Sequence, residues 1–359
     1  MTFSEQTSRH IVIVTQAFDP HTDELLVLLR YMGQDPIRIN TECIPGDSLL
    51  SYTFAGSEHC LAPENTAQGG TAPADSGHYT LFIDGRLIEA EQIGAIWWRR
   101  PAPYRFIGTL QPEELHLATA ETEQAMQGFW LALSAQDCYW MSDPMVIALA
   151  RNHPEQIRRA HRCGFAIPHS LLTTHSGHLR TFYQETGGQV VYRMLSTQDG
   201  HQRLAHQESG ALVSEEMLAV FEDMVSVPCL FHQRLESSRF LQVVVIGTQV
   251  FAAQTSETNG KLSQVAHWWS PEVSELSYEP AALPDDLVER CRTFVQSYGL
   301  EFGVIQLALG PGGQLFFVSL DPVGSFLWLE QQCPNLRMSE ALAGQLIVGM
   351  THAQVSGRR

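Results

Sequence analysis

The chain of 359 residues carries a formal net charge of −17, with 22 Lys and Arg against 39 Asp and Glu. This balance excludes a broad surface for nucleic acid or anionic membrane, because phosphate groups are bound by clustered cations. A hydrophobic fraction of 44% with 17% charged residues is typical of a globular protein with a large buried core. We therefore expect neither a nucleic-acid partner nor a membrane.

The sequence also indicates the compartment. No apolar run reaches the roughly 18 residues that a transmembrane helix needs. The N-terminal stretch MTFSEQTSRH lacks the basic-then-apolar layout of a signal peptide. Seven scattered cysteines form no CxxC pair, which favours free thiols in a reducing compartment. We expect a cytoplasmic protein.

Residues 1–142 alternate short apolar runs with amphipathic stripes, which is typical of an α/β domain. Thr22 stands where it could cap the first helix. The stretch 56–77, rich in Gly, Ala, Pro, Ser and Thr, predicts a long mobile loop. Strands are expected over 11–14, 36–39, 79–83, 86–88 and 93–98, and helices over 23–32 and 113–133. The segments 139–141 and 144–150 end this region.

From Asn152 the pattern restarts and predicts two further regions, 143–235 and 236–359, in which helices and hairpins mix. Pro154 lies in the first turn of the first helix, where proline is favoured. Helices are expected over 154–163, 178–185, 285–298 and 338–348, with another that begins at Ser214. Strands are expected over 171–174, 190–194, 229–233, 240–246, 249–254 and in a hairpin over 305–318.

This last hairpin turns at Gly310-Pro311-Gly312-Gly313, because glycine supplies positive φ and proline fixes the entry to the turn. Its pairing should bring Gln306, Ser319 and Asp321 together at a buried edge. These side chains could form a polar site. Alternatively they are hydrogen-bonded core positions, with Asp321 capping the turn at Pro322.

Several sequence motifs resemble, in the same order along the chain, those of the ATP-grasp ligases, and among them those of the graspetide (microviridin-type) maturases of ribosomal peptides. They are IVIVTQAFDPHTD at the start, IWWRRP at 96–101, the 152–168 segment, LLTT at 171–174, the 240–254 hairpin and the 299–330 stretch. The resemblance implies an α/β and α+β protein with the ATP-grasp fold. A pre-ATP-grasp α/β domain (1–142) would precede a central lobe (143–235) and a C-terminal lobe (236–359), which would clamp ATP.

The activity that the resemblance implies is phosphorylation of a side-chain carboxylate by ATP and Mg²⁺. An amine or a hydroxyl would then capture the acyl phosphate, closing a lactam or lactone in a precursor peptide. The resemblance places the nucleotide at Asn152, His153, Arg193 and Gln233. His153 and Arg193 stand where the family has lysines, and Gln242 stands where it has an arginine. Arg193 keeps the charge with a different geometry.

The metal ligands depart from the family in the same way. The Asp, Glu and Asn of the family align with Gln306, Ser319 and Asp321. Magnesium prefers hard, charged oxygen ligands, and an amide, a hydroxyl and one carboxylate make a poor dinuclear site. The candidate catalytic residues are Arg193 and Asp321.

A candidate peptide site follows the strand that ends at Trp98. Arg99 and Arg100 come directly after it, where α/β sheets place ligands, and could clamp an acidic peptide. In the other interpretation, Trp98 belongs to the core and the arginines pair with surface carboxylates.

Two hypotheses follow for function. In the first, the protein is a pseudoenzyme without a required cofactor that binds a precursor peptide or a partner ATP-grasp ligase. In the second, it is an active ATP- and Mg²⁺-dependent ligase in which Asp321, Glu330 or Glu257 rebuild the metal site.

Two weaker expectations accompany these hypotheses. A thiol nucleophile, Cys229 or Cys291, could carry a different acyl transfer on the same fold. Family analogy also implies a homodimer.

Overall fold

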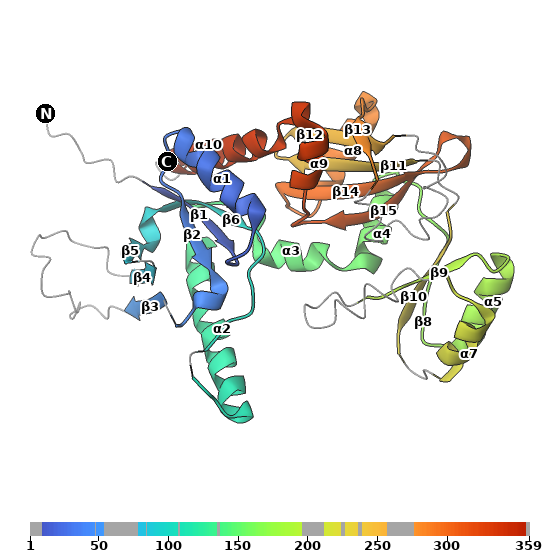
Figure 1. The fold of residues 1–359 in the computed structure, drawn as a ribbon, viewed down its shortest axis with the longest axis horizontal. Coiled ribbons are helices and arrows are strands. Elements are labelled where there is room, and N and C mark those ends of the chain that lie inside the picture. Colours follow the sequence, from blue (N-terminus) through green and yellow to red (C-terminus); the bar gives the residue numbers. More distant parts are fainter. Residues whose placement is uncertain are drawn as a thin grey trace, which may run out of the picture. The chain divides into compact units, whose positions relative to one another are not determined.

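The computed structural model describes residues 9–46, 48–53, 78–83, 85–106, 108–134, 137–195, 212–223, 227–235, 239–256 and 276–356. The chain forms two compact units, drawn in Figure 1. The first comprises Met1–Met141 with Ser339–Arg359, and the second comprises Ser142–Met338. The predicted loop 56–77 lies outside the described residues. No described helix is long and apolar enough to cross a membrane.

The first unit is built on a parallel sheet of order β2-β1-β6-β7, which confirms the predicted α/β pattern. The side chains of α2 that face the sheet, Met126, Phe129, Trp130 and Leu133, share a core with Val12, Val14 and Ile96. The elements are β1 (His10–Thr15), α1 (Pro20–Tyr31), β2 (Ile37–Asn40), β6 (Ile93–Trp98), α2 (Pro112–Ser134), β7 (Tyr139–Met141) and α10 (Met338–Ser356).

An antiparallel sheet of order β3-β4-β5 adds to the same core through Leu81, Ile83 and Ile88. The hairpin β4 (His78–Ile83) and β5 (Arg86–Glu89) confirms the prediction. The sequence did not predict β3 (Ser48–Thr53), which pairs along the whole of β4.

The prediction that Thr22 caps α1 is wrong, because the helix begins three residues earlier than expected, at Pro20. Asp19 is the N-cap and its carboxylate accepts the backbone N–H of His21, with Pro20 in the first turn. Proline is favoured at the first helical position, where its missing N–H costs nothing. The Thr22 hydroxyl instead donates to the Asp19 carboxylate at 2.7 Å.

The last helix, α10, belongs to the first unit from Ser339 onward and packs on β7. Residue 349 must be glycine at this contact, because a Cβ there would lie 2.3 Å from the ring of Tyr139. Our sequence division had placed this helix in the C-terminal lobe, whereas its contacts group residues from Ser339 onward with the first unit. The division into three regions is otherwise untested by this grouping.

The second unit contains a five-stranded antiparallel sheet of order β13-β12-β11-β14-β15, which includes both predicted hairpins. The glycine turn is tight as expected, with φ of 72° at Gly312 and 79° at Gly313. The elements are β11 (Arg239–Ile246), β12 (Gln249–Thr255), β13 (Tyr278–Pro280), α8 (Asp285–Gln296), β14 (Phe302–Leu309), β15 (Leu315–Asp321) and α9 (Leu327–Gln332).

A smaller sheet of order β8-β10-β9 completes this unit and packs on α5 and α7 through Leu179, Phe182, Leu218 and Phe231. Its elements are β8 (Ser170–Thr173), α5 (Ser176–Glu185), β9 (Val190–Arg193), α7 (Glu215–Asp223) and β10 (Cys229–Gln233), preceded by α3 (Pro144–Ala150) and α4 (His153–Arg162).

The outer edge of β15 finds its hydrogen bonds outside the sheet. The Gln156 side chain donates to the Leu320 carbonyl at 2.8 Å and accepts the Leu320 N–H at 3.1 Å, as a neighbouring strand would. The Phe317 N–H bonds the Ala166 carbonyl at 2.8 Å, and Arg193 donates to the Val318 carbonyl at 3.3 Å. Buried backbone groups need such partners, so α4 and β9 are tied to this edge.

We expect Gln156→Leu to lower the free energy of unfolding by about 2–4 kcal/mol, because the buried N–H and C=O of Leu320 lose their partner. Urea denaturation measures the change. Gln254→Leu is the matched control, since Gln254 bonds only at the surface, to Glu279, and should cost less than about 0.5 kcal/mol. Equal effects of the two substitutions would contradict this account of the edge.

Candidate functional site

A polar cluster lies beside β15 in the second unit. His153 opens α4 because the preceding Asn152 caps the helix, its Oδ1 accepting the Glu155 N–H at 3.0 Å. The ring of His153 lies 5.5 Å from that of His232 on β10, and Arg193 comes from the neighbouring strand β9. The structure thus brings together three side chains from α4, β9 and β10.

Both histidines of this cluster are neutral. Burial, with a smaller contribution from the nearby Arg193, lowers the pKa of His232 to about 3. Burial also lowers the pKa of His153 well below its ordinary value, with Arg193 and His232 adding to the effect. Burial lowers the pKa of Arg193 to about 9, so this guanidinium keeps its charge at neutral pH.

The hydrogen bonds fix which ring nitrogen carries the proton. Nδ1 of His153 lies 3.1 Å from the Gln156 Oε1, an acceptor, so Nδ1 is the donor. Nδ1 of His232 lies 2.8 Å from the Ser170 hydroxyl. Because that hydroxyl donates its proton to the Pro168 carbonyl, the His232 Nδ1 is the donor to Ser170. Each ring therefore carries a lone pair on Nε2, which repels a phosphate oxygen instead of attracting it.

Next to the cluster, a row of neutral polar side chains crosses three strands. Gln242 on β11 faces Gln306 on β14, which faces Ser319 on β15. Gln242 and Gln306 are 7% and 8% exposed, and the Ser319 Oγ lies 3.5 Å from the Gln306 Oε1. Gln242 also bonds the Tyr278 hydroxyl, whose pKa burial raises to about 12. The structure therefore brings Gln306 and Ser319 together as predicted.

The ladder is irregular directly beside this row. Gln306 faces Ser319 and Leu307 faces Phe317, so Val318 is the extra residue of a bulge. Bulges of this kind are common next to functional sites because they re-aim a side chain or a carbonyl. The Val318 carbonyl is the group that Arg193 contacts.

Asp321 ends β15 and is exposed. Its Oδ1 accepts the Val323 N–H at 3.0 Å, which is the turn-capping role that the sequence left open. Glu330 lies on α9 and Glu257 lies outside the described residues. Within the described ranges, no group of three or more His, Cys, Asp or Glu could hold a metal ion.

These residues do not fit a dinuclear magnesium site. Magnesium prefers charged oxygens in octahedral geometry. The row instead offers two amides and a hydroxyl that bond one another or Tyr278, beside one carboxylate that caps a turn.

The other predicted residues lie as follows. Gln233 is exposed at the end of β10, where its backbone N–H bonds the His169 carbonyl. Cys229 and Cys291 are buried, and burial raises the pKa of both thiols, to about 12 for Cys291. A raised pKa removes the thiolate that a nucleophile needs.

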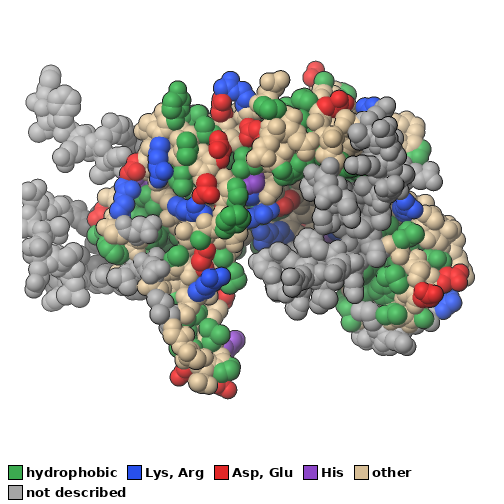
Figure 2. Space-filling view, viewed as in Figure 1, with side chains coloured by type: hydrophobic (Ala, Val, Ile, Leu, Met, Phe, Trp, Pro, Cys, Tyr) green, Lys and Arg blue, Asp and Glu red, His purple; other side chains and the backbone are tan. Residues whose placement is uncertain are grey.

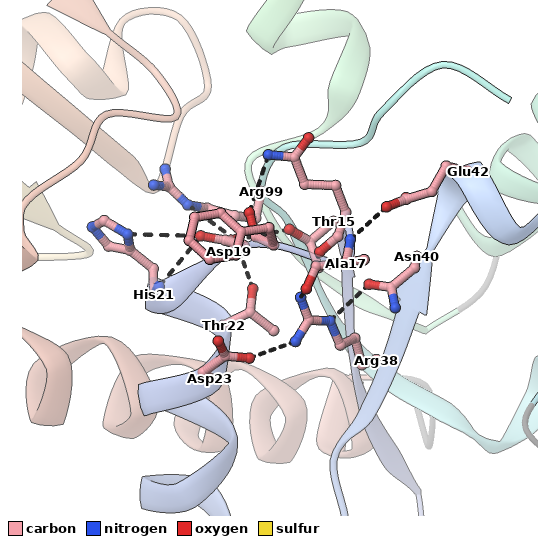
Figure 3. A network of polar contacts seen from close by, with 12 residues as sticks. Thr15, Ala17, Asp19, His21, Thr22, Asp23, Arg38, Asn40, Glu42 and Arg99 are labelled. Carbon is pink, nitrogen blue, oxygen red and sulfur yellow. Dashed lines mark hydrogen bonds and ion pairs between the residues drawn. The ribbon is translucent and has the colours of Figure 1, made fainter. Parts of the chain in front are cut away.

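A second polar network lies in the first unit, at the carboxyl ends of β1 and β6. The order β2-β1-β6-β7 places successive strands on either side of β1, so a topological switch point lies between β1 and β6. Open α/β sheets bind ligands at such points. Figure 3 shows the network there, in which Asp19 and Arg99 meet.

Arg99 is fully buried and its Nε lies 3.6 Å from the Asp19 Oδ2. Burial alone would raise the pKa of Asp19, but Arg99 and hydrogen bonds from Thr15 and Thr22 outweigh it and hold the pKa below its usual value. Burial and, after it, the charge of Arg99 lower the pKa of the neighbouring His21 to about 3. Arg99 therefore stabilises the structure at the carboxyl ends of β1 and β6, with its guanidinium directed towards Asp19.

Trp98 and Arg100 flank this pair. Trp98 is half-buried and packs edge-on against Trp130, with ring centroids 5.3 Å apart. Arg100 is half-buried and close enough to His21 to lower its pKa. Of the three residues predicted to bind peptide, Arg99 is therefore buried against Asp19 and Trp98 packs on Trp130.

No family model matches the sequence, and no curated protein matches it. Solved structures do match. A RiPP-associated ATP-grasp ligase from Chryseobacterium gregarium, in complex with ADP and a leader and core peptide, has 21% identity and a TM-score of 0.77, covering 94% of this chain and 96% of that one. The chain has the ATP-grasp fold.

Two further ATP-grasp structures come from Microcystis aeruginosa MRC. The macrocyclase MdnC, bound with the precursor peptide MdnA, has 19% identity and a TM-score of 0.76, covering 94% of this chain and 99% of that one. The macrocyclase MdnB has 22% identity and a TM-score of 0.72, with the same coverage. The predicted ATP-grasp architecture and the resemblance to graspetide ligases are thus confirmed at the level of the fold.

Sequence reasoning missed three members of these networks. Gln156, His232 and Asp19 were not singled out, although the word FDPHTD was noted. The signal for Asp19 was its place directly before Pro20, which marks an N-cap. Nothing local could reveal Gln156, because its partner, Leu320, is 164 residues away in the chain.

The neutral histidines predict a loss of stability in acid. The unfolded chain takes up a proton at each of them below about pH 6.5, while His232 stays neutral in the folded state down to about pH 3. The stability contributed by each neutral histidine is therefore present at neutral pH and falls as the pH drops. At about pH 5 we expect a loss of about 2 kcal/mol per histidine.

His232→Gln should make the drop in unfolding free energy between neutral pH and about pH 5 smaller by about 2 kcal/mol, because one uptake site is gone. Urea denaturation at the two pH values measures it. The exposed control Gln233→Ser should keep the parent pH dependence. A His232→Gln protein with the parent slope would show that His232 is not held neutral.

Proposed function

We propose that this ATP-grasp-fold protein acts in the maturation of ribosomal peptides (RiPPs, of the graspetide kind) by binding, without turning over ATP. Its partner is a precursor peptide or an ATP-grasp ligase. Two of the similar structures hold peptides, which supports a peptide as the partner. A cytoplasmic location and a homodimer belong to this proposal on sequence grounds.

The observation that carries the proposal is the charge of the site beside β15. Phosphoryl transfer needs cations on the triphosphate and a metal that neutralises the charge developing on its oxygens. Among the described residues of this cluster, Arg193 is the cation, while His153 and His232 are neutral and present lone pairs. These three side chains, as the structure describes them, supply less positive charge than a bound triphosphate requires.

The row Gln242, Gln306 and Ser319 supports the same conclusion from the metal side. The Ser319 Oγ lies 3.5 Å from the Gln306 Oε1, and Gln242 bonds the Tyr278 hydroxyl, so the partners of the row are neutral groups. Neutral amides and hydroxyls do not supply the charge that favours a magnesium ion. In this proposal the sheet supports binding of the partner instead.

We expect magnesium with millimolar ATP to raise the melting temperature by less than about 1 °C, because ligand binding stabilises only in proportion to its affinity. Differential scanning fluorimetry measures the shift, and magnesium with ADP is the matched control. A rise of several degrees with Mg-ATP would count heavily against the proposal.

The second candidate is an active ligase with a rebuilt site. Arg193 contacts the strand that ends at Asp321, so one cation and one carboxylate lie on a shared element. This candidate predicts ADP release when a precursor peptide is added, and loss of that release in Asp321→Ala. ADP release that survives Asp321→Ala would place the metal elsewhere.

A further inference from the structure

The two sheets of the second unit have four outer edges, and three of them find partners among the described residues. The edge of β15 bonds to residues of α4 and β9. On β9, the Val190 carbonyl accepts the Val213 N–H at 2.8 Å. On β13, the Gln332 Oε1 accepts the Tyr278 N–H at 2.8 Å, and Pro280 has no N–H to offer. The fourth edge is that of β8.

Two residues of β8 direct their backbone groups away from the sheet. The Gln233 N–H bonds the His169 carbonyl at 2.8 Å, so in this antiparallel register every second residue from His169 onward bonds β10. The N–H and C=O groups of Ser170 and Leu172 therefore point outward. Within the described ranges, no backbone hydrogen bond reaches these groups. Donors and acceptors thus alternate along the open edge as they do in a β-ladder.

This open edge is accessible from solvent. Leu172 is 48% exposed and Ser170 is half-buried. Backbone groups that face solvent can bond water, so an open edge is tolerated here, whereas the buried edge of β15 needs protein partners. A solvent-facing edge remains a template on which another strand can pair. The edge of β8 is therefore suited to bind the main chain of a ligand.

The side chains at this edge favour an apolar residue on one face of an added strand. Leu172 stands opposite Leu230 on β10, which is buried, so the two form an apolar row that ends at the edge. Figure 2 shows hydrophobic side chains grouped on the described part of the lobe that β8, α5 and α7 form. An apolar side chain opposite Leu172 would extend the row by one strand, and such cross-strand pairs stabilise a sheet.

A small cavity lies on the other face of β8, the face that carries α5 and α7. Leu179, Phe221 and Phe231 line it with apolar groups, and Thr173 and Thr174 line it from the end of β8. Its volume of about 20 Å³ admits roughly one small group, since a single water molecule needs about 10–15 Å³. Successive side chains of a strand point to opposite faces. The neighbours of the apolar residue would thus point towards the cavity, which favours small side chains.

A second copy of β8 fits this edge less well than a peptide does. In an antiparallel pair of two β8 strands that uses both open residues, each Leu172 would stand opposite a Ser170. An arrangement with Leu172 opposite Leu172 would leave a single bonded pair within the strand. A peptide can set an apolar residue opposite Leu172 and still bond Ser170.

We propose that the edge of β8 binds an extended peptide by strand addition, with an apolar residue opposite Leu172 and small residues at the alternate positions. The N–H and C=O groups of Ser170 and Leu172 pair with the peptide backbone, which supplies affinity, while the side-chain positions supply selectivity. This inference rests on the proposed peptide-binding function and names where, and in which conformation, the peptide is held.

The first test uses the full-length protein and a fluorescein-labelled peptide in which Val and Ala alternate between terminal serines. Fluorescence anisotropy gives the affinity. With a Val opposite Leu172, each Val N–H faces β8 and each Ala N–H faces solvent. N-methylation of every Val should therefore weaken binding at least about tenfold, because the bonds to β8 are lost. N-methylation of every Ala is the matched control and should leave the affinity of the parent peptide.

The second test changes the protein. Leu172→Glu should weaken binding of the unmodified peptide at least about tenfold, because it places a charge in the apolar row. Val220→Glu is the matched control, since Val220 is an equally exposed apolar residue (58%) that lies on α7 instead of β8, and it should bind like the parent. Melting temperatures confirm that the variants are folded. Leu172→Thr, which keeps a high strand propensity, repeats the comparison if Leu172→Glu does not fold.

Three results would overturn the proposal: equal losses from N-methylation of Val and of Ala, equal binding by Leu172→Glu and Val220→Glu, or no binding of the peptide. Light scattering that finds a dimer which Leu172→Glu dissociates would overturn it as well, because a second copy would then occupy the edge.

These outcomes differ from those that test the proposed function. Peptide binding that is lost on N-methylation of Val, in a protein that also turns over ATP, would support strand addition at β8 and reject binding without turnover. A protein that neither responds to ATP nor distinguishes the two methylated peptides would reject strand addition and leave the proposed function standing.

Discussion

The second unit depends on one constraint: the outer edge of β15 must find hydrogen-bond partners away from the sheet. Gln156 supplies a side-chain amide that imitates a strand, Ala166 supplies a carbonyl, and Arg193 supplies a guanidinium. Because these partners come from α4, from the extended segment after it and from β9, satisfying the edge also fixes the position of His153 and Arg193. The polar cluster exists where it does because an edge strand cannot be left unpaired.

The same strand shows that the backbone has the ATP-grasp arrangement while the side chains lack the charge that ATP and magnesium require. The chain has the ATP-grasp fold, and within it β14 and β15 form a hairpin with a bulge and a glycine turn. The side chains of the row are neutral. Gln242 faces Gln306 across the sheet and bonds Tyr278, and the Ser319 Oγ lies 3.5 Å from the Gln306 Oε1. A neutral row avoids the desolvation penalty of buried charges. In the first unit, charged side chains remain instead. Arg99 pairs with Asp19, and Arg38 donates to the Ala17 carbonyl in the loop after β1.

The sequence predicted what local rules determine. Alternating apolar residues and the Gly-Pro-Gly-Gly turn were enough to place the hairpin. The register next to the turn, with Leu309 opposite Leu315, would by itself set Gln306 opposite Val318, and the bulge at Val318 is what brings Gln306 opposite Ser319. Local rules failed where a distant partner decides. From the sequence alone, Gln156 is an ordinary polar residue of a helix, and α10 is predicted to belong to the lobe that precedes it. Thr22 was preferred as a cap over Asp19 because the helical stripe begins later than the helix itself.

Whether the β15 site holds a metal–nucleotide complex is the claim on which the functional account rests. Electron paramagnetic resonance of Mn²⁺ with ATP, used in place of magnesium, measures it directly, because the signal of the mobile complex disappears when protein binds it. We predict that stoichiometric protein leaves the Mn²⁺–ATP signal unchanged. A loss of the signal in proportion to the protein, which Asp321→Ala abolishes, would contradict the account and support the hypothesis of an active ligase.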